Sequence, residues 1–255
     1  MFTDAHAHYE DEAFDSDRAE VLKKIQKAGC ELVVDAASDV ETSKKILELT
    51  RQNPFIYGAF GVHPSEASVF TDSELDIIES LAEDPKCVAI GEIGLDYHSD
   101  FSEKERQQEV FRMMLRLAKK LDKPFVIHDR EAHRDVLDIL EGEQVDGSKC
   151  LIHCFSGSRE MAEICMKRGY FISIGGAVTF KNARRIHEVL SVVPLERILL
   201  ETDCPYMTPE PNRGKRNDSS NIFYTALKIA EVKGVSYEEV CRQTSANTRA
   251  FYRIL

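Results

Sequence analysis

Short apolar runs alternate with longer amphipathic segments along most of the chain. The runs are nearly continuously hydrophobic and rich in β-branched and aromatic residues, which is typical of strands that are buried on both faces. They predict eight strands, at residues 2–8, 31–36, 55–61, 87–92, 125–128, 150–154, 170–174 and 198–203.

The amphipathic segments between these runs predict helices. Gly29 and Gly169 each follow such a segment, and glycine is the residue best suited to the position just after a helix. Ser102 and Glu105 have the spacing of a capping box, which marks a helix start. Helices are therefore predicted at residues 17–28, 40–52, 73–83, 102–121, 132–140, 158–168, 182–192, 222–233 and 236–254.

Eight strands that alternate with helices favour parallel βα units, and 255 residues is the usual size of one (β/α)8 domain. Polar residues follow the ends of the first, third, fourth, fifth, sixth and eighth predicted strands. An open sheet places its site at one switch point, whereas a barrel gathers every strand end around one mouth. We therefore expect an α/β fold, a (β/α)8 TIM barrel with C-terminal helices, in which residues 1–255 form a single domain.

Charge and cysteine content narrow the functional classes. The chain has 33 Lys and Arg against 44 Asp and Glu, a net charge of −11. Such a protein repels a polyanion at long range, which disfavours a broad footprint on DNA but allows a small phosphate site neutralised by metal ions. The seven cysteines are irregularly spaced and odd in number, which disfavours a disulfide framework or a zinc ribbon.

No apolar run is long enough to span a bilayer, and the opening MFTDAHAH lacks the basic and apolar regions of a secretory signal. We therefore expect a cytoplasmic protein with no membrane partner. The sequence gives no evidence of an obligatory protein partner.

Six residues of metal-binding type lie at the ends of predicted strands. Side chains alternate along a strand, so His6 and His8 point the same way and reach one metal from one edge. Taken singly, each of the six has a structural explanation. Together they form a nitrogen and oxygen set suited to divalent ions, and six donors exceed what one catalytic zinc needs. We therefore predict two metals bridged by a carboxylate, held by His6, His8, Glu92, His128, His153 and Asp203.

The motifs DAHAH, GVHP, GEIGLDYH, IHDRE, HCFSG and ETDCPY occur in this order. In order and spacing, the chain resembles the TatD-type metal-dependent deoxyribonucleases, a branch of the amidohydrolase superfamily. The resemblance extends from Asp4 to the C-terminal helices. One departure is that Asn217 is followed by Asp-Ser-Ser where family members often have Glu-Pro, which alters the loop expected to fit the substrate.

The resemblance implies roles for the predicted ligands. His6 and His8 are expected to hold one metal, His128 and His153 the other, with Glu92 bridging. Asp203 is expected on the first metal as the catalytic acid and base. Family members hydrolyse phosphodiester bonds, commonly as 3′ to 5′ exonucleases on single strands, with magnesium, manganese or zinc.

Three further residues are candidates for substrate binding. His63 is expected to contact a phosphate or relay a proton, or else to cap a loop. Arg130 follows His128 by two residues and is suited to clamp a phosphate, unless it pairs with Glu92 or Glu201. Arg213 forms the one basic cluster near the predicted site, with Lys215 and Arg216, unless this loop is simply solvated.

We therefore predict a hydrolase that uses a water molecule activated by two metals to cleave single-stranded nucleic acid, most readily DNA. One alternative keeps the site but cleaves esters, lactones or amides, including the ester bond of an aminoacyl-tRNA. A second alternative is a metal-binding protein without catalysis, although a structural zinc site is normally closed by four ligands. The physiological substrate, the native metal, exonuclease against endonuclease action and the oligomeric state stay open.

Overall fold

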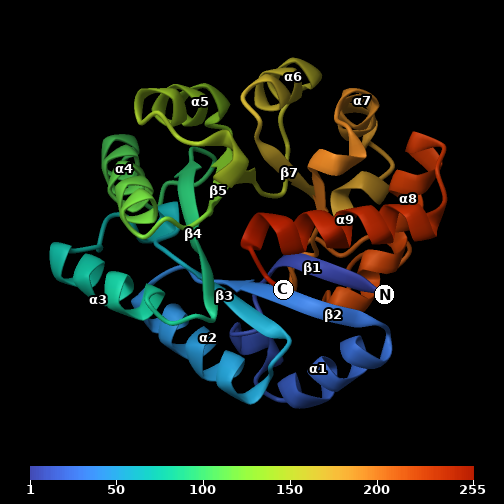
Figure 1. The fold of residues 1–255 in the computed structure, drawn as a ribbon, viewed down its shortest axis with the longest axis horizontal. Coiled ribbons are helices and arrows are strands. Elements are labelled where there is room, and N and C mark those ends of the chain that lie inside the picture. The colour runs from blue at the N-terminus through green and yellow to red at the C-terminus, as the bar shows by residue number, and fades with distance from the viewer. The chain divides into compact units, whose positions relative to one another are not determined.

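In a computed structural model, which describes all 255 residues, strands and helices alternate along the chain (Figure 1). Eight strands follow one another in one sheet in the order of the sequence, β1 to β8. The strand pairs are parallel. This is the topology of a (β/α)8 barrel, as the sequence predicts.

The chain divides into two compact units, which are described separately. The terminal unit comprises Met1–Asp35 and Cys154–Leu255, and the central unit comprises Ala36–His153. Neighbouring strands within each unit are buried over nearly their whole length. This burial on both faces explains why the strands are almost continuously apolar in the sequence.

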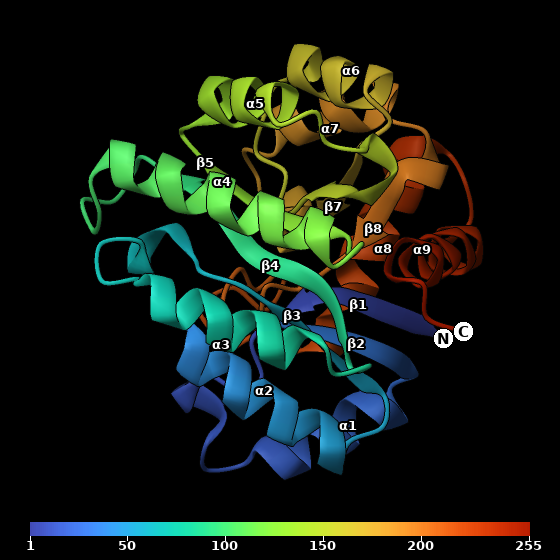
Figure 2. The same ribbon diagram turned by 60° about the vertical axis from the view of Figure 1, so that its left-hand side comes forward.

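The terminal unit joins the two ends of the chain. Its last helix packs against β1 and β8 (Figure 2), and the hydroxyl of Tyr252 donates a hydrogen bond of 2.8 Å to the carbonyl oxygen of Ala5. The elements are β1 (Phe2–Ala7), α1 (Arg18–Lys27), β2 (Cys30–Ala36), α6 (Arg159–Lys167), β7 (Phe171–Ile174), α7 (Arg184–Val192), β8 (Ile198–Leu200), α8 (Ile222–Lys233) and α9 (Tyr237–Tyr252).

The central unit is continuous in sequence. The long strand β4 has α4 alongside it (Figure 2). The elements are α2 (Val40–Gln52), β3 (Ile56–Phe60), α3 (Asp72–Ala82), β4 (Cys87–Asp96), α4 (Lys104–Lys120), β5 (Phe125–Arg130), α5 (His133–Gly142) and β6 (Cys150–Ile152). Short 3₁₀ helices occur in both units, at Glu12–Phe14, Pro64–Glu66, Gly147–Lys149, Gly176–Thr179, Leu195–Arg197 and Ser219–Asn221.

All predicted strands and helices are present, and two helices begin and end at the predicted residues. The capping box predicted at the start of α4 is wrong. This helix begins at Lys104, after Glu103, because the hydroxyl of Ser102 donates instead to the carbonyl oxygen of Ser65. No helix is both long and apolar enough to cross a membrane.

Several strand ends differ from the prediction. Strand β1 ends at Ala7 and β6 at Ile152, so His8 and His153 each lie just after a strand rather than in it. Strand β4 continues four residues beyond Glu92 to Asp96, and its register against β5 shifts between Ile90 and Ile93. Strand β8 ends at Leu200, so Asp203 lies in the loop that follows it. Glu92 and Asp203 therefore both lie where regular strand pairing is interrupted.

Candidate active site

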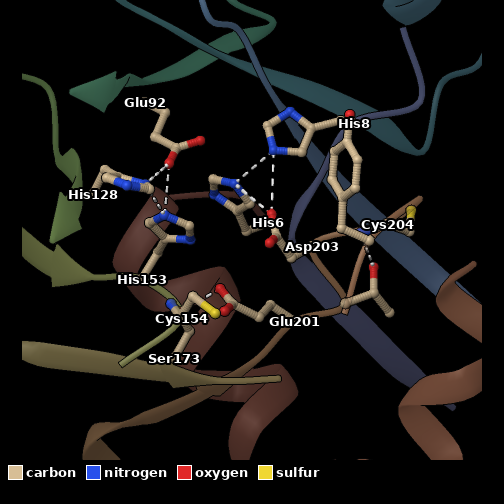
Figure 3. Close-up of polar contacts among 12 residues, drawn as sticks. His6, His8, Glu92, His128, His153, Cys154, Ser173, Glu201, Asp203 and Cys204 are labelled. Carbon is tan, nitrogen blue, oxygen red and sulfur yellow. Dashed lines mark hydrogen bonds and ion pairs between the residues drawn. The ribbon is translucent and has the colours of Figure 1, made fainter. Parts of the chain in front are cut away.

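Three candidate ligands of the terminal unit meet within a few ångströms (Figure 3). Nε2 of His6 lies 3.2 Å from Nε2 of His8. Oδ1 of Asp203 lies 3.6 Å from the first of these nitrogens and 3.3 Å from the second. His6 lies in β1 and His8 follows that strand directly; the two imidazoles are two residues apart and face the same side.

The spacing of these three atoms fits one bound cation. Donors arranged tetrahedrally around an ion at about 2.1 Å lie about 3.4 Å from one another, and the observed distances are 3.2, 3.3 and 3.6 Å. Two imidazole nitrogens and a carboxylate oxygen are also ligands that zinc and manganese accept. His6, His8 and Asp203 are therefore suited to hold a divalent metal.

The loop that carries Asp203 is held from both sides. Asp203 has a φ of 55°, and its backbone N–H donates to the carbonyl oxygen of His6 at 3.0 Å. The side-chain amide of Asn217 donates to the carbonyl oxygens of Thr202 and Tyr206, at 3.0 and 2.7 Å. Asn217 is fully buried, so it fixes the backbone on either side of the candidate base.

The sequence predicts Asp203 at the end of the eighth strand; that placement is wrong because Asp203, like Cys204 after it, follows β8 in a loop. Cys204 is nevertheless buried, and burial raises the pKa of its thiol well above the ordinary value. Its carbonyl oxygen accepts from the N–H of His8 at 2.8 Å. Cys204 therefore supports β1 through its backbone.

A buried carboxyl group anchors β1 to the same loop. Asp4 is fully buried and accepts hydrogen bonds of 2.6 Å from the hydroxyls of Thr202 and Ser219. Burial raises the pKa of Asp4 to about 7, although these hydrogen bonds oppose the increase. Ser219 belongs to the segment that departs from the family pattern, and here it ties that segment to β1.

A second carboxylate supports His8 from behind. Oε1 of Glu10 lies 3.6 Å from Nδ1 of His8. The residue between these two in the sequence, Tyr9, donates its N–H to the buried carboxylate of Asp35 in a hydrogen bond of 2.6 Å. Burial alone would lower the pKa of His8, but hydrogen bonds and attraction to Asp203 and Glu10 raise it well above the ordinary value. Glu10 is not among the residues predicted from the sequence, although its spacing two residues beyond His8 repeats that of the histidine pair.

The candidate ligands of the central unit converge on one oxygen atom (Figure 3). Oε1 of Glu92 lies 2.6 Å from Nδ1 of His128 and 2.7 Å from Nε2 of His153. The two nitrogens are 3.3 Å apart. Nε2 of His63 lies 3.7 Å from the same oxygen. This second set also consists of nitrogen and oxygen donors of the kind that divalent cations accept, although its contacts of 2.6 and 2.7 Å are hydrogen bonds, shorter than the separation of donors around one ion.

The second ring nitrogen of His128, Nε2, is held by Asp96, which is not among the residues predicted from the sequence. Oδ2 of Asp96 lies 3.2 Å from Nε2 of His128. Burial would raise the pKa of Asp96, but the hydrogen bond and attraction to His128 outweigh it and lower the pKa. Burial would likewise lower the pKa of His128, yet Asp96 and Glu92 raise it. Carboxylates commonly orient metal-binding imidazoles in this way.

Glycine is required beside Glu92. Gly94 has a φ of 143°, and a Cβ atom there would lie 2.0 Å from the carbonyl oxygen of His128. A Cβ atom at Gly91 would lie 2.7 Å from Cβ of Val126. The glycines of GEIG therefore allow β4 and β5 to approach closely enough for Glu92 to reach His128.

Of the two roles that the sequence left open for His63, the structure shows the loop cap. Its Nδ1 accepts a hydrogen bond from the N–H of Ser65 at 3.1 Å and caps the short helix Pro64–Glu66. Its ring also stands edge-on to that of His128, with centroids 4.5 Å apart. The imidazole thus has one nitrogen bound to the loop and the other directed at Glu92.

The basic candidates differ in whether another side chain already contacts their guanidinium groups. Arg130 is exposed and forms no ion pair, so the alternative that it pairs with Glu92 or Glu201 is wrong. The guanidinium of Arg213 lies 3.8 Å over the ring of Phe180. Arg216, expected in the same basic cluster, is instead engaged by the carboxylate of Asp17 at 2.6 and 2.9 Å.

Comparison with known proteins assigns the family. The family described as "TatD related DNase" matches residues 3–253. The chain belongs to this family. It is therefore a metal-dependent hydrolase, as predicted, and the alternative of a metal-binding protein without catalysis is not supported.

Individual TatD relatives match over the full chain. One is an uncharacterized metal-dependent hydrolase, YabD of Bacillus subtilis, 43% identical over 254 residues that cover 100% of both chains. Another is the 3′-5′ ssDNA/RNA exonuclease TatD of Erwinia tasmaniensis, 32% identical over 94% of this chain and 95% of its own. The crystal structure of YJJV, a TatD homologue from Escherichia coli K12, superposes with a TM-score of 0.94 at 29% identity, covering 100% of this chain and 98% of its own.

Proposed function

We propose that this TatD-family hydrolase cleaves phosphodiester bonds in single-stranded nucleic acid and removes nucleotides from the 3′ end, with DNA as the expected substrate. The observation that carries the proposal is the cluster of His6, His8 and Asp203, three donors spaced for one cation in a chain of this family. The named exonuclease activity of the Erwinia relative supports the choice of substrate.

Two divalent ions, zinc, magnesium or manganese, complete the proposed site. His6, His8 and Asp203 would hold one ion, His128 and His153 the other, with Glu92 bridging. When bound, such ions lower the pKa of a water molecule and neutralise charge on a phosphate. The chemistry of both donor sets supports this assignment.

The proposed role of Asp203 is to accept the proton of the attacking water. Its side chain is 19% exposed, so water and a phosphate have access to the carboxylate. Deprotonated carboxylates within hydrogen-bond reach of a water commonly act as general bases. The backbone bonds on either side of Asp203 keep the carboxylate in place during the transfer.

Substrate contacts are proposed for His63, Arg130 and Arg213. The free guanidinium of Arg130 is suited to bind two phosphate oxygens at once. The loop holds His63 through Nδ1, which leaves Nε2 oriented toward the carboxylate of Glu92. We also propose that residues 1–255 fold as one domain and that the protein is cytoplasmic.

The test is to incubate metal-loaded protein with end-labelled single-stranded DNA, a matched duplex, an RNA and a panel of carboxylic esters. We expect single-stranded DNA labelled at its 5′ end to shorten stepwise, with release of mononucleotides identified by mass. Asp203→Asn protein, prepared in parallel, controls for contaminating nucleases. Ester hydrolysis without any cleavage of DNA or RNA would contradict the proposal and favour the ester-cleaving alternative.

A further inference from the structure

A deep cleft lies in the terminal unit beside the loop that carries Asp203. Its volume is about 910 Å³, within the range of small-molecule sites. It is lined by the segment 154–160, the turn after β7, the start of α7 and Met207 of the Asp203 loop. The candidate ligands do not account for this space, and of the proposed substrate contacts only Arg213 lies beside it, over the ring of Phe180.

Glycines bring the cleft close to the candidate site. A Cβ atom at Gly175 would lie 3.4 Å from Cγ of the buried Glu201. A Cβ atom at Gly176 would lie 2.1 Å from the carbonyl oxygen of Met207. The floor of the cleft therefore packs directly on the segment that begins with Glu201 and contains Asp203.

The basic residues of the cleft are unequally engaged. Arg159 pairs with Glu163 at 3.1 Å, and Arg184 pairs with Glu188 at 2.9 Å. Arg185, which also lines the cleft, is exposed and has no acidic partner. One guanidinium in the wall is thus available to an anion, in a protein whose net charge is −11.

The cleft that contains Arg185 is also lined by an aromatic side chain. Phe180 lines the cleft and is only partly buried, and the guanidinium of Arg213 lies 3.8 Å over its ring. Aromatic rings and arginine planes are the surfaces on which bases of single strands stack. The cleft thus offers a guanidinium for a phosphate and an aromatic surface on which an unpaired base can stack.

A second hollow beside the same loop has the opposite character. It is lined by Asp11, Glu12 and Asp15, and its one arginine, Arg216, is paired with Asp17. A phosphate there would face three carboxylates. The cleft has two carboxylates, Glu160 and Glu188, against three arginines, whereas this hollow has three carboxylates against one arginine. The charges therefore favour the cleft as the path of a polyanion leaving the Asp203 loop.

We propose that this cleft binds the part of a single-stranded nucleic acid that adjoins the nucleotide being removed. A phosphate lies at Arg185, and a base stacks on the Phe180–Arg213 pair. The inference rests on the proposed function and extends it, because it places the strand beyond the scissile bond. It also explains why a net acidic protein holds a single strand with few basic side chains.

Binding measured without turnover tests this cleft. Arg185→Ala and Phe180→Leu are each made in the Asp203→Asn protein, and the affinity for a fluorescent single-stranded 12-mer is followed by anisotropy across a salt series. We expect a loss of about tenfold for each. Arg185→Ala should also make the log–log salt slope shallower by about 0.7, the value for one phosphate on a single strand.

Two controls isolate the cleft. Arg242→Ala removes the same charge from an exposed pair with Glu239 on α9 and should leave affinity and slope unchanged. Arg185→Lys keeps the charge and should restore the slope. In the active protein, KM should rise for the 12-mer and stay within about twofold for bis(4-nitrophenyl) phosphate, which is too short to enter the cleft.

The outcomes separate this proposal from the function on which it rests. If the Asp203→Asn protein binds single strands but both cleft variants bind with parental affinity and slope, the cleft assignment is wrong and the proposed function stands. If the parental protein binds neither DNA nor RNA at low salt, the proposed function fails, and the cleft assignment fails with it.

Discussion

The carboxylate of Glu10 lies 3.6 Å from Nδ1 of His8, while Nε2 of the same ring lies 3.3 Å from Asp203. The imidazole is therefore held between two acids, one on each nitrogen. A ring fixed at its far nitrogen presents the other lone pair in a constant direction, which strengthens metal binding.

Glu10→Gln should weaken metal binding without preventing folding. The amide keeps the size of the side chain but loses the charge that orients His8, and we expect a loss of about 10- to 100-fold in affinity at this site. Competition with a chromogenic chelator measures it. Glu12→Gln, a neighbouring change, is the control, and equal affinities in the two variants would remove Glu10 from the site.

Glu92→Ala tests the number of metals. If Glu92 bridges two ions, its loss should lower the occupancy of both, and elemental analysis should fall from about two ions per chain toward zero. The fold should persist, as shown by an unchanged circular dichroism spectrum. One ion per chain in the unaltered protein, unaffected by this substitution, would contradict the two-metal proposal.

Asp203→Asn tests the proton transfer. The amide retains the shape of the side chain but cannot accept the proton, so turnover should fall by about 10²–10⁴-fold. Metal should be largely retained at the histidines of the central unit. Turnover close to that of the unaltered protein, with metal bound, would assign the base to another group, and His63 is then the first candidate.

Asp4 should make the stability of the metal-free protein depend on pH. Its pKa is about 7 in the folded protein against 3.8 for the unfolded chain, so its contribution is complete below about pH 4 and is lost as the pH rises through 7. Between pH 5 and 8 the loss is on the order of 3 kcal/mol. Urea denaturation in the presence of EDTA measures it.

Asp4→Asn provides the comparison for that measurement. The amide resembles the protonated acid, because its oxygen still accepts from the N–H of Thr202 while its nitrogen donates to the two hydroxyls. The variant should lack this part of the decline between pH 5 and 8. The same pH dependence in both proteins would show that Asp4 is not the titrating group.

Much of the fold follows from local pattern. Buried parallel strands are apolar on both faces, so their runs stand out in one sequence, as do the candidate ligands that follow them. The ends of β4 and β8 cannot be predicted from local pattern, because Glu92 and Asp203 lie where regular pairing is interrupted. The capping motif at Ser102 failed because a tertiary partner, Ser65, competes for the hydroxyl.

The supporting residues depend on long-range contacts. Nothing local distinguishes Glu10 or Asp96 from an exposed acid, and their roles appear only when a histidine ring lies beside them. The availability of a charge is equally non-local. Arg216 looked free in a basic loop, but Asp17, almost two hundred residues earlier, neutralises it.

The terminal unit is assembled from the two ends of the chain, and this sets an order on biosynthesis. A chain grows from its N-terminus, so His6 and His8 leave the ribosome first, and Asp203 follows only after most of the chain has been made. The central unit, with Glu92, His128 and His153, is complete by then. A nascent chain that stalls before Asp203 therefore lacks its candidate base and the third donor of the His6–His8 cluster, so the hydrolase should stay inactive until Asp203 has left the ribosome.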